Sequence, residues 1–280
     1  MERSQPMTEP QNTNASEMLA AVQHGNSADA ILRRLATRAM GLTGADIERI
    51  VREARLKARR GKRAVSYEDI EDGIRGDRPP VPYNLRWRFA FHEAGHAVVH
   101  HALDLGPVRG LNIDTGQGGY NLVGFHVWAS DTRDWYENML AMLMAGRAAE
   151  QLVLKRVSSG SAGADDSDLA RATRLAFDME RTLGFGTEHP LLYRPHRDPS
   201  AVLDRDAELA ARVHARLVAA LERAVAILKR RRPTFHALAK ALFDAQAMDE
   251  TAVSEILKDV EPLHGSGPDE VVTQATPILP

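Results

Sequence analysis

Residues Phe91–Leu103 have the sequence FHEAGHAVVHHAL, which contains the most informative motif of this chain. It contains the pattern His-Glu-x-x-His, with His92, Glu93 and His96 in the fixed positions. On an α-helix, residues four apart lie one turn above each other on the same face. The two imidazoles can therefore share one metal ion, and Glu93 can reach a water molecule on the open side of that ion.

The residues around the pattern indicate that its helix is buried. The segment is rich in apolar side chains, namely Phe89, Phe91, Ala94, Ala97, Val98 and Ala102. Burying a glutamate and two histidines without partners is costly, and a metal ion is the simplest partner for all three. Gly95 is disfavoured in a helix by about 1 kcal/mol relative to alanine, so we expect another segment to pack closely there. The alternative, a surface helix with two solvated histidines, is disfavoured by this context.

The composition is that of an ordinary globular protein. The chain has 280 residues, of which 44% are hydrophobic, 26% charged and 5% aromatic, and this favours a mainly helical fold of one or two domains. A net charge of −2 gives no reason to expect nucleic acid as a partner. The absence of cysteine excludes disulfides and thiolate zinc ligands and fits a cytoplasmic setting. No segment approaches the roughly 18 apolar residues of a membrane helix.

We expect five regions along the chain. They are a flexible segment at 1–27 with a short helix near 17–22, a small helical subdomain at 28–76, a proline-rich linker at 77–84, the domain containing the motif at 85–260, and a disordered tail at 261–280. Thr43 with Asp46, and Ser66 with Asp69, have the spacing of helix-capping residues. The basic run at 57–63 is typical of a solvated helix end rather than a nucleic-acid patch.

The domain that contains the motif should be helical with a small β-hairpin or sheet. Alternating apolar residues predict two short strands, one with Val108, Leu111 and Ile113 and one with Val123, Phe125 and Val127. The Gly-rich turn at 116–121 lacks the ending of a phosphate loop. An edge strand beside the motif helix could bind an extended peptide by backbone hydrogen bonds, or the pair could be a plain hairpin. Helices are expected at 134–155, 169–183, 204–231, 233–247 and 250–259.

A third metal ligand is not given by the motif itself. Asp165, Asp166 and Asp168 precede the expected helix at 169–183, and a carboxylate is the commonest partner of two histidines in hydrolytic sites. A helix cap would explain one of these aspartates as well. His100 lies about 12 Å along the helix axis from His92, too far to share the ion. We expect structural or surface roles for the histidines at 126, 189, 196, 214 and 236.

Several motifs in order carry a family resemblance. The succession HEAGHA, a strand pair, AGRAAE, SSG…DSDLARAT and LGFG resembles the peptidase domain of FtsH-type AAA+ zinc metalloproteases. Residues 28–76 look like the helical lid that ends the ATPase module of that family. The resemblance implies a Zn²⁺ ion bound by His92, His96 and Asp168, with Glu93 as the catalytic residue. Glu150 would orient a histidine through a hydrogen bond, or it would be a surface residue.

The resemblance also implies an activity and partners. It implies a zinc metalloendopeptidase that cleaves unfolded proteins or peptides and assembles as a homo-oligomeric six-fold ring. The phosphate loop and the other ATPase motifs of the family are absent from this sequence, as are its membrane-spanning segments. We therefore expect an AAA+ ATPase partner in trans, and the start at Met1 favours a stand-alone descendant over a fragment. The alternative is a non-catalytic or regulatory subunit that assembles with a motor-bearing protease, and the intact Glu93 argues against it.

Overall fold

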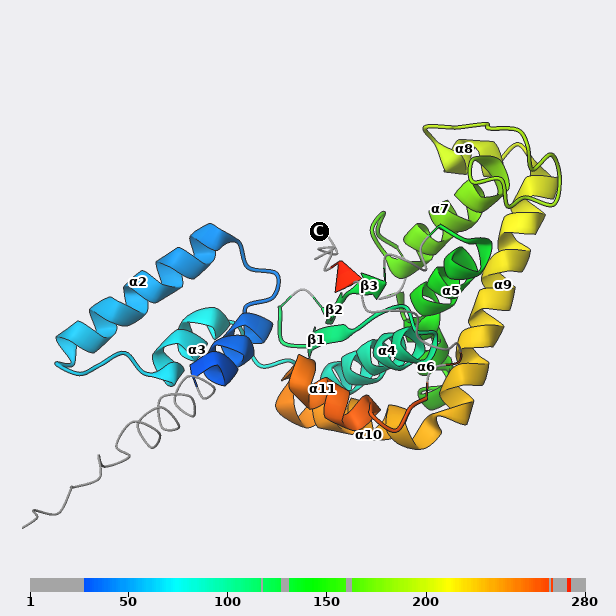
Figure 1. Ribbon diagram of the computed structural model, residues 1–280. Coiled ribbons are helices and arrows are strands. Elements are labelled where there is room, and N and C mark those ends of the chain that lie inside the picture. Colours follow the sequence, from blue (N-terminus) through cyan, green and yellow to red (C-terminus); the bar gives the residue numbers. More distant parts are fainter. Residues whose placement is uncertain are drawn as a thin grey trace, which may run out of the picture.

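The structure is a computed structural model that describes residues 28–116, 118–126, 131–159, 163–261, 263 and 271–272. It is mainly helical with a small β-sheet, as the sequence predicts (Figure 1). The helices are residues 28–38, α2 (Gly44–Arg60), α3 (Tyr67–Arg75), α4 (Tyr83–Ala102), α5 (Arg133–Leu143), α6 (Ala145–Val153), α7 (Asp168–Arg181), α8 (Pro199–Leu203), α9 (Ala207–Arg230), α10 (Arg232–Ala245) and α11 (Glu250–Leu257). The strands are β1 (Val108–Asn112), β2 (Tyr120–Val123), β3 (Phe125–His126), β4 (Ala247–Asp249) and β5 (Val271–Val272). The short helix expected near 17–22 lies outside the described residues.

Helix α4, which contains the motif, is the centre of the larger domain. It packs against α6 and α10, and the long helix α9 runs beside α5, α6 and α7 (Figure 1). Every residue of α4 from Ala90 to His100 is buried. The Phe91 ring lies 5.4 Å from the Phe235 ring of α10, centroid to centroid, and burying one such side chain stabilises a fold by about 1.5–3 kcal/mol. The predicted burial of the motif helix is confirmed.

The sheet lies beside α4 and has the order β2-β1-β4, with both pairs antiparallel. Strand β1 is central and β2 is an edge strand among those described. Two expectations need correction. Residues Tyr120 and Asn121 belong to β2 rather than to the turn. The second expected strand is divided at Gly124 into β2 and β3, and β3 pairs with β5 rather than with β1. The N–H of Gly124 still donates to the Pro107 carbonyl at 2.8 Å, and Val127 lies outside the described residues.

The C-terminal part contains strands that the sequence analysis missed. Strand β4 closes the sheet by pairing with β1, directly before Asp249 caps α11. Strand β5 lies inside 261–280, where a disordered tail was expected, and it pairs with β3. The short α8, which begins with Pro199 after the cap Asp198, was also missed.

The helix expected at 134–155 is two helices, because α5 ends at Leu143 and α6 begins at Ala145. Met144 joins them with φ −82° and ψ −4°. The carbonyl of Met142 accepts a hydrogen bond from His96 Nδ1 at 2.8 Å. A tertiary contact of this kind is not visible in the helical periodicity of the sequence.

The small helical subdomain follows its sequence signals closely. Thr43 with Asp46 and Ser66 with Asp69 form complete capping boxes at the starts of α2 and α3. The basic run ends α2, as expected, and Lys57 Nζ lies 3.3 Å from the buried carboxylate of Asp69. The hydrogen bonds from the Arg63 guanidinium and, to a smaller extent, from the Ser66 N–H hold the pKa of Asp69 well below its usual range. Capping signals within a few residues are therefore enough to predict where the helices of this subdomain begin.

One buried amide joins the helical subdomain to the sheet. Asn112, the last residue of β1, is 1% exposed, and its Nδ2 donates to the carbonyls of Thr37 at 2.9 Å and Arg38 at 3.2 Å. These carbonyls lie at the C-terminal end of the helix at 28–38, where helices have unpaired acceptors. Gly110, also on β1, lies so close to Met40 that an added Cβ would come within 2.7 Å of Met40 Cε.

None of the helices in the described part of the chain has the length and apolar character needed to cross a membrane.

Candidate metal centre

Helix α4 holds the two histidines of the motif side by side. His92 Nε2 and His96 Nε2 are 3.1 Å apart, and their rings meet edge to face with centroids 4.8 Å apart. Both side chains are buried, at 8% and 7% exposure. The four-residue spacing on a helix accounts for this arrangement.

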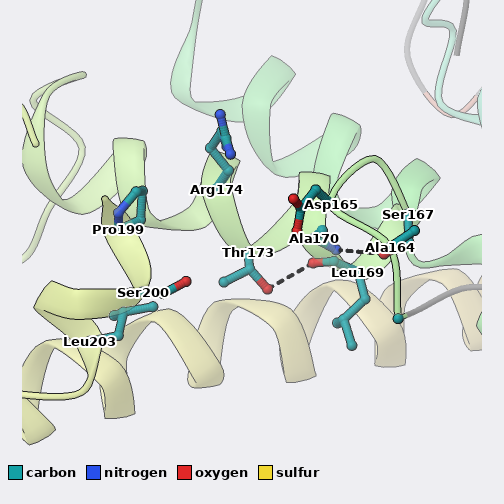
Figure 2. A pocket seen from close by; sticks show the side chains of 11 residues that line it. Ala164, Asp165, Ser167, Leu169, Ala170, Thr173, Arg174, Pro199, Ser200 and Leu203 are labelled. Atoms are coloured by element: carbon teal, nitrogen blue, oxygen red, sulfur yellow. Dashed lines mark hydrogen bonds between the residues drawn. The ribbon is translucent and has the colours of Figure 1, made fainter. Parts of the chain in front are cut away.

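Asp168 meets the two histidines from the start of α7. Its Oδ2 lies 3.2 Å from His92 Nε2 and 3.2 Å from His96 Nε2. The hydroxyl of Ser167 caps α7 by accepting from the Ala170 N–H (Figure 2), so the Asp168 carboxylate is free to face α4. Among the described residues, these three are the one group of histidines and acids placed to hold a metal ion.

The other two aspartates considered as ligands do not join this group. Asp165 lines a separate pocket of about 370 Å³. Figure 2 shows this pocket between the loop before α7, one face of α7 and α8, with Thr173 and Arg174 on its wall. Asp166 precedes the Ser167 cap in the loop.

Outer contacts fix the tautomer of both histidines. His92 Nδ1 donates to Glu150 Oε1 at 3.0 Å, and His96 Nδ1 donates to the Met142 carbonyl at 2.8 Å. Because a carboxylate and a carbonyl can only accept, each Nδ1 has a proton, and the lone pair of each ring is on Nε2 whenever that ring is neutral. Of the two alternatives for Glu150, the structure shows the buried residue that orients a histidine. Ser158 holds that carboxylate through its N–H at 2.7 Å and its hydroxyl at 3.0 Å.

The donor set fits a zinc ion. Two imidazole lone pairs and one carboxylate oxygen converge with mutual distances of 3.1–3.2 Å. Ligands of a tetrahedral zinc at bonds of 2.0–2.1 Å are about 3.3 Å apart. Three lone pairs facing one another repel unless a metal ion or a proton lies among them. Burial lowers the pKa of His92, but the carboxylates of Asp168 and Glu150 outweigh it and raise that pKa to about 10, which shows how strongly the site attracts positive charge.

Electrostatics favour an ionised Asp168 and a less acidic Glu93. Burial raises the pKa of the Asp168 carboxyl, but His96 and His92 outweigh burial and hold this pKa well below its usual range. Burial raises the pKa of Glu93 above its ordinary value, although both histidines oppose this. Glu93 is 6% exposed and accepts a hydrogen bond from Asn121 of β2. A buried glutamate with a raised pKa is suited to take up a proton.

Two glycines let α6 approach the motif. A Cβ on Gly95 would lie 2.7 Å from Ala149 Cβ and 2.9 Å from the Ala145 carbonyl, so the close packing predicted at Gly95 is confirmed. Gly146 lies directly against the imidazoles, and a Cβ there would come within 2.5 Å of His96 Nε2.

His100 lies away from the donor group. Its Nε2 donates to the Gly124 carbonyl at 3.0 Å, and burial lowers its pKa to about 3. His100 is therefore a neutral core residue that fastens the end of β2 to α4.

Several residues of the site could not be recognised from the sequence. The Met142 carbonyl and Ser158 gave no signal, because any residue supplies a carbonyl and serine is common in loops. Asn121 was assigned to a turn. Gly146 was visible as a glycine in a helical pattern, which often marks a close approach.

The site has the arrangement of a His-Glu-x-x-His metallopeptidase. It consists of two histidines one helical turn apart, a glutamate between them and an aspartate from another helix. Residues 83–256 match the model of peptidase family M41, and residues 29–72 match that of the AAA+ lid domain. The chain belongs to peptidase family M41.

Curated relatives agree with this assignment. The chain is 30% identical over 264 residues to the ATP-dependent zinc metalloprotease FtsH of Caldicellulosiruptor bescii. This match covers 84% of this chain and 41% of that protein. The chain is 31% identical over 281 residues to FtsH 2 of Symbiobacterium thermophilum, with 91% and 46% covered. It is 34% identical over 248 residues to FtsH 3 of Sphaerobacter thermophilus, with 82% and 48% covered. The chain therefore spans less than half the length of these relatives.

Proposed function

We propose that this chain is a zinc-dependent endopeptidase whose ligands are His92, His96 and Asp168 and whose general base is Glu93. The observation that carries the proposal is the convergence of three lone-pair donors, each 3.1–3.2 Å from the others, beside a buried glutamate. A zinc ion bound there would lower the pKa of water and polarise the scissile carbonyl. Three protein ligands leave a fourth position open, as a catalytic site requires.

The residues of the chain have separate tasks in this proposal. Glu93 takes a proton from the attacking water and delivers it to the leaving amine. Glu150 and the Met142 carbonyl keep the lone pairs of both histidines directed at the ligand position. Asp168 adds the negative charge that two neutral histidines lack.

The substrate proposed is an extended, unfolded polypeptide. Strand β2 is an edge strand among the described strands, and the segment that leads into it touches Glu93 at Gly119. An extended peptide could pair with such an edge through backbone hydrogen bonds. Side-chain selection would then come from neighbouring pockets rather than from the backbone pairing.

Two further proposals come from the family. The relatives are named ATP-dependent, and the match at residues 29–72 is to the lid domain of AAA+ proteins. We therefore expect the unfolding of stable substrates to need an ATPase, either in trans or in a longer polypeptide. A six-fold ring of this chain is the assembly expected by likeness, and its mass in solution would test that expectation.

The test uses one substrate and one matched variant. Purified protein with one equivalent of zinc should cleave an unfolded casein-like substrate, and a chelator should abolish the cleavage. Glu93→Gln keeps the size of the side chain and should retain zinc while losing activity by several orders of magnitude. Zinc binding with equal activity in wild type and Glu93→Gln would rule out the proposed mechanism. Zinc binding without any activity in wild type would favour the regulatory subunit instead.

A further inference from the structure

The side chain of Asn121 on β2 contacts Glu93 at two points. Its Nδ2 lies 2.9 Å from the Glu93 carbonyl oxygen and 3.2 Å from Glu93 Oε2. Both partners are acceptors, so the nitrogen of the amide must face Glu93, and the orientation of Asn121 follows from chemistry alone. One side chain thus holds both the backbone and the carboxylate of the same residue.

The Glu93 carboxylate is enclosed from a second direction by Gly119. A Cβ added at Gly119 would collide first with Glu93 Oε1 and would lie 2.6 Å from Glu93 Cδ, so only a glycine leaves room for the carboxylate. The position of Asn121 is set by the sheet, because Asn121 pairs with Leu111 of the central strand β1, and Gly119 directly precedes β2. The carboxylate therefore lies between the Gly119 backbone and the Asn121 amide, and among the described residues only Oε2 receives a hydrogen bond.

Stability alone does not explain an asparagine at this position. Asparagine is depleted in β-strands. Its Oδ1 is also buried without a hydrogen-bond partner in the described part of the chain, which destabilises a fold. A residue that violates local preference beside a catalytic group suggests a functional reason.

We propose that Asn121 is a positioning residue for Glu93. By holding Oε2, it fixes the rotation of the carboxylate and leaves Oε1 as the oxygen that accepts the proton of the attacking water. The inference rests on the proposed function, because the orientation of the Glu93 carboxylate matters only if that carboxylate takes a proton from the attacking water. It assigns Asn121 no contact with zinc, and metal content should therefore be independent of it.

The kinetic test replaces Asn121 by leucine, which has a similar size and no donor. We expect kcat to fall roughly 10- to 100-fold, the scale of losses caused by misplacing a catalytic group, with KM and bound zinc unchanged. In the Glu93→Gln background the same replacement should cause no further loss, because the two residues act as one unit. Asn138→Leu is the matched control, since Asn138 is a buried asparagine of α5 that also has an unpartnered Oδ1 among the described residues.

A second measurement tests the contact without turnover. In the metal-loaded protein, the NMR signals of the Asn121 side-chain NH₂ should show slow exchange with solvent, and Glu93→Ala should shift them. Signals that Glu93→Ala leaves unchanged would overturn the positioning role, even if the protein is an active protease. Equal kcat losses for Asn121→Leu in the wild-type and Glu93→Gln backgrounds, or an effect on KM alone, would also overturn it. A shifted signal in a protein without zinc-dependent cleavage would instead reject the proposed function and, with it, this role of Asn121.

Discussion

Gly146 is the position where one added methyl group should most strongly weaken metal binding. In Gly146→Ala the new Cβ would lie 2.5 Å from His96 Nε2 and nearer still to the ring of His92. Nonbonded atoms of this kind prefer separations of about 3.5 Å, so one or both rings must move by roughly 1 Å. A metal site tolerates deviations of only about 0.2 Å in its ligand distances. The ligand geometry is therefore lost unless α6 itself moves away.

Two effects of opposite sign compete in Gly146→Ala. Helix propensity favours alanine over glycine by about 1 kcal/mol. Overpacking usually costs about 1–3 kcal/mol, and here it falls directly on two proposed ligands. Substitutions that only touch ligand partners lower metal affinity about 10- to 100-fold, so a direct clash should reach at least the upper value. A 100-fold loss corresponds to about 2.7 kcal/mol.

The assay is a competition titration with a chromophoric zinc chelator, with circular dichroism to verify the fold. Gly44→Ala in α2 is the matched control, because an added Cβ there meets nothing within 4 Å. The control should bind zinc like the wild type. A folded Gly146→Ala protein with the same zinc affinity as Gly44→Ala would refute this account of how α6 packs against the histidines.

Three further changes test other contacts. Glu150→Leu removes the acceptor for His92 Nδ1 and should lower zinc affinity about 10- to 100-fold in the same titration; an unchanged affinity would mean that the tautomer is fixed otherwise. The folded-state pKa of His100 is lowered to about 3, so below about pH 6.5 the unfolded state binds a proton that the folded state does not. The free energy of unfolding should then fall by up to about 1.4 kcal/mol per pH unit as the pH falls from about 6.5 to about 3. Denaturation of the metal-free protein at several pH values should show a weaker dependence of this free energy on pH for His100→Phe than for the wild type. An equal dependence in both proteins would contradict this reasoning. Asn112→Leu removes the side-chain donor to the carbonyls of Thr37 and Arg38, of which Thr37 keeps the longer hydrogen bond from the Met40 N–H at 3.4 Å. The loss should cost about 1–3 kcal/mol of stability. It should also speed hydrogen exchange in residues 28–40, and unchanged exchange there would show that other contacts hold the junction.

Features set by neighbouring residues could be predicted from the sequence. The capping boxes at Thr43 and Ser66 and the buried helix around His92 follow rules that operate over a few residues. The pairing of His92 with His96 is also local, because one helical turn determines it. The mainly helical fold with a small sheet could therefore be predicted.

Features set by contacts between distant segments could not be predicted in this way. Asp168 is separated from His92 by 76 positions, and only the family resemblance distinguished it from Asp165 and Asp166. The break at Met144 accompanies a hydrogen bond between α4 and α5, and the periodicity of either helix contains no trace of it. Asn121 was placed in a turn because glycines precede it, whereas pairing with β1 extends the strand to include it.

The side-chain amide of Asn112 connects the helical subdomain to the strands that lie beside Glu93. It binds the end of the helix at 28–38, and its own residue pairs with Tyr120 of β2. The next residue on β2, Asn121, binds Glu93. A rotation of the helical subdomain that preserves these hydrogen bonds must carry β1 and β2 with it. A force applied to the part of the chain that matches an AAA+ lid would then be transmitted through the sheet to the strand beside the proposed general base.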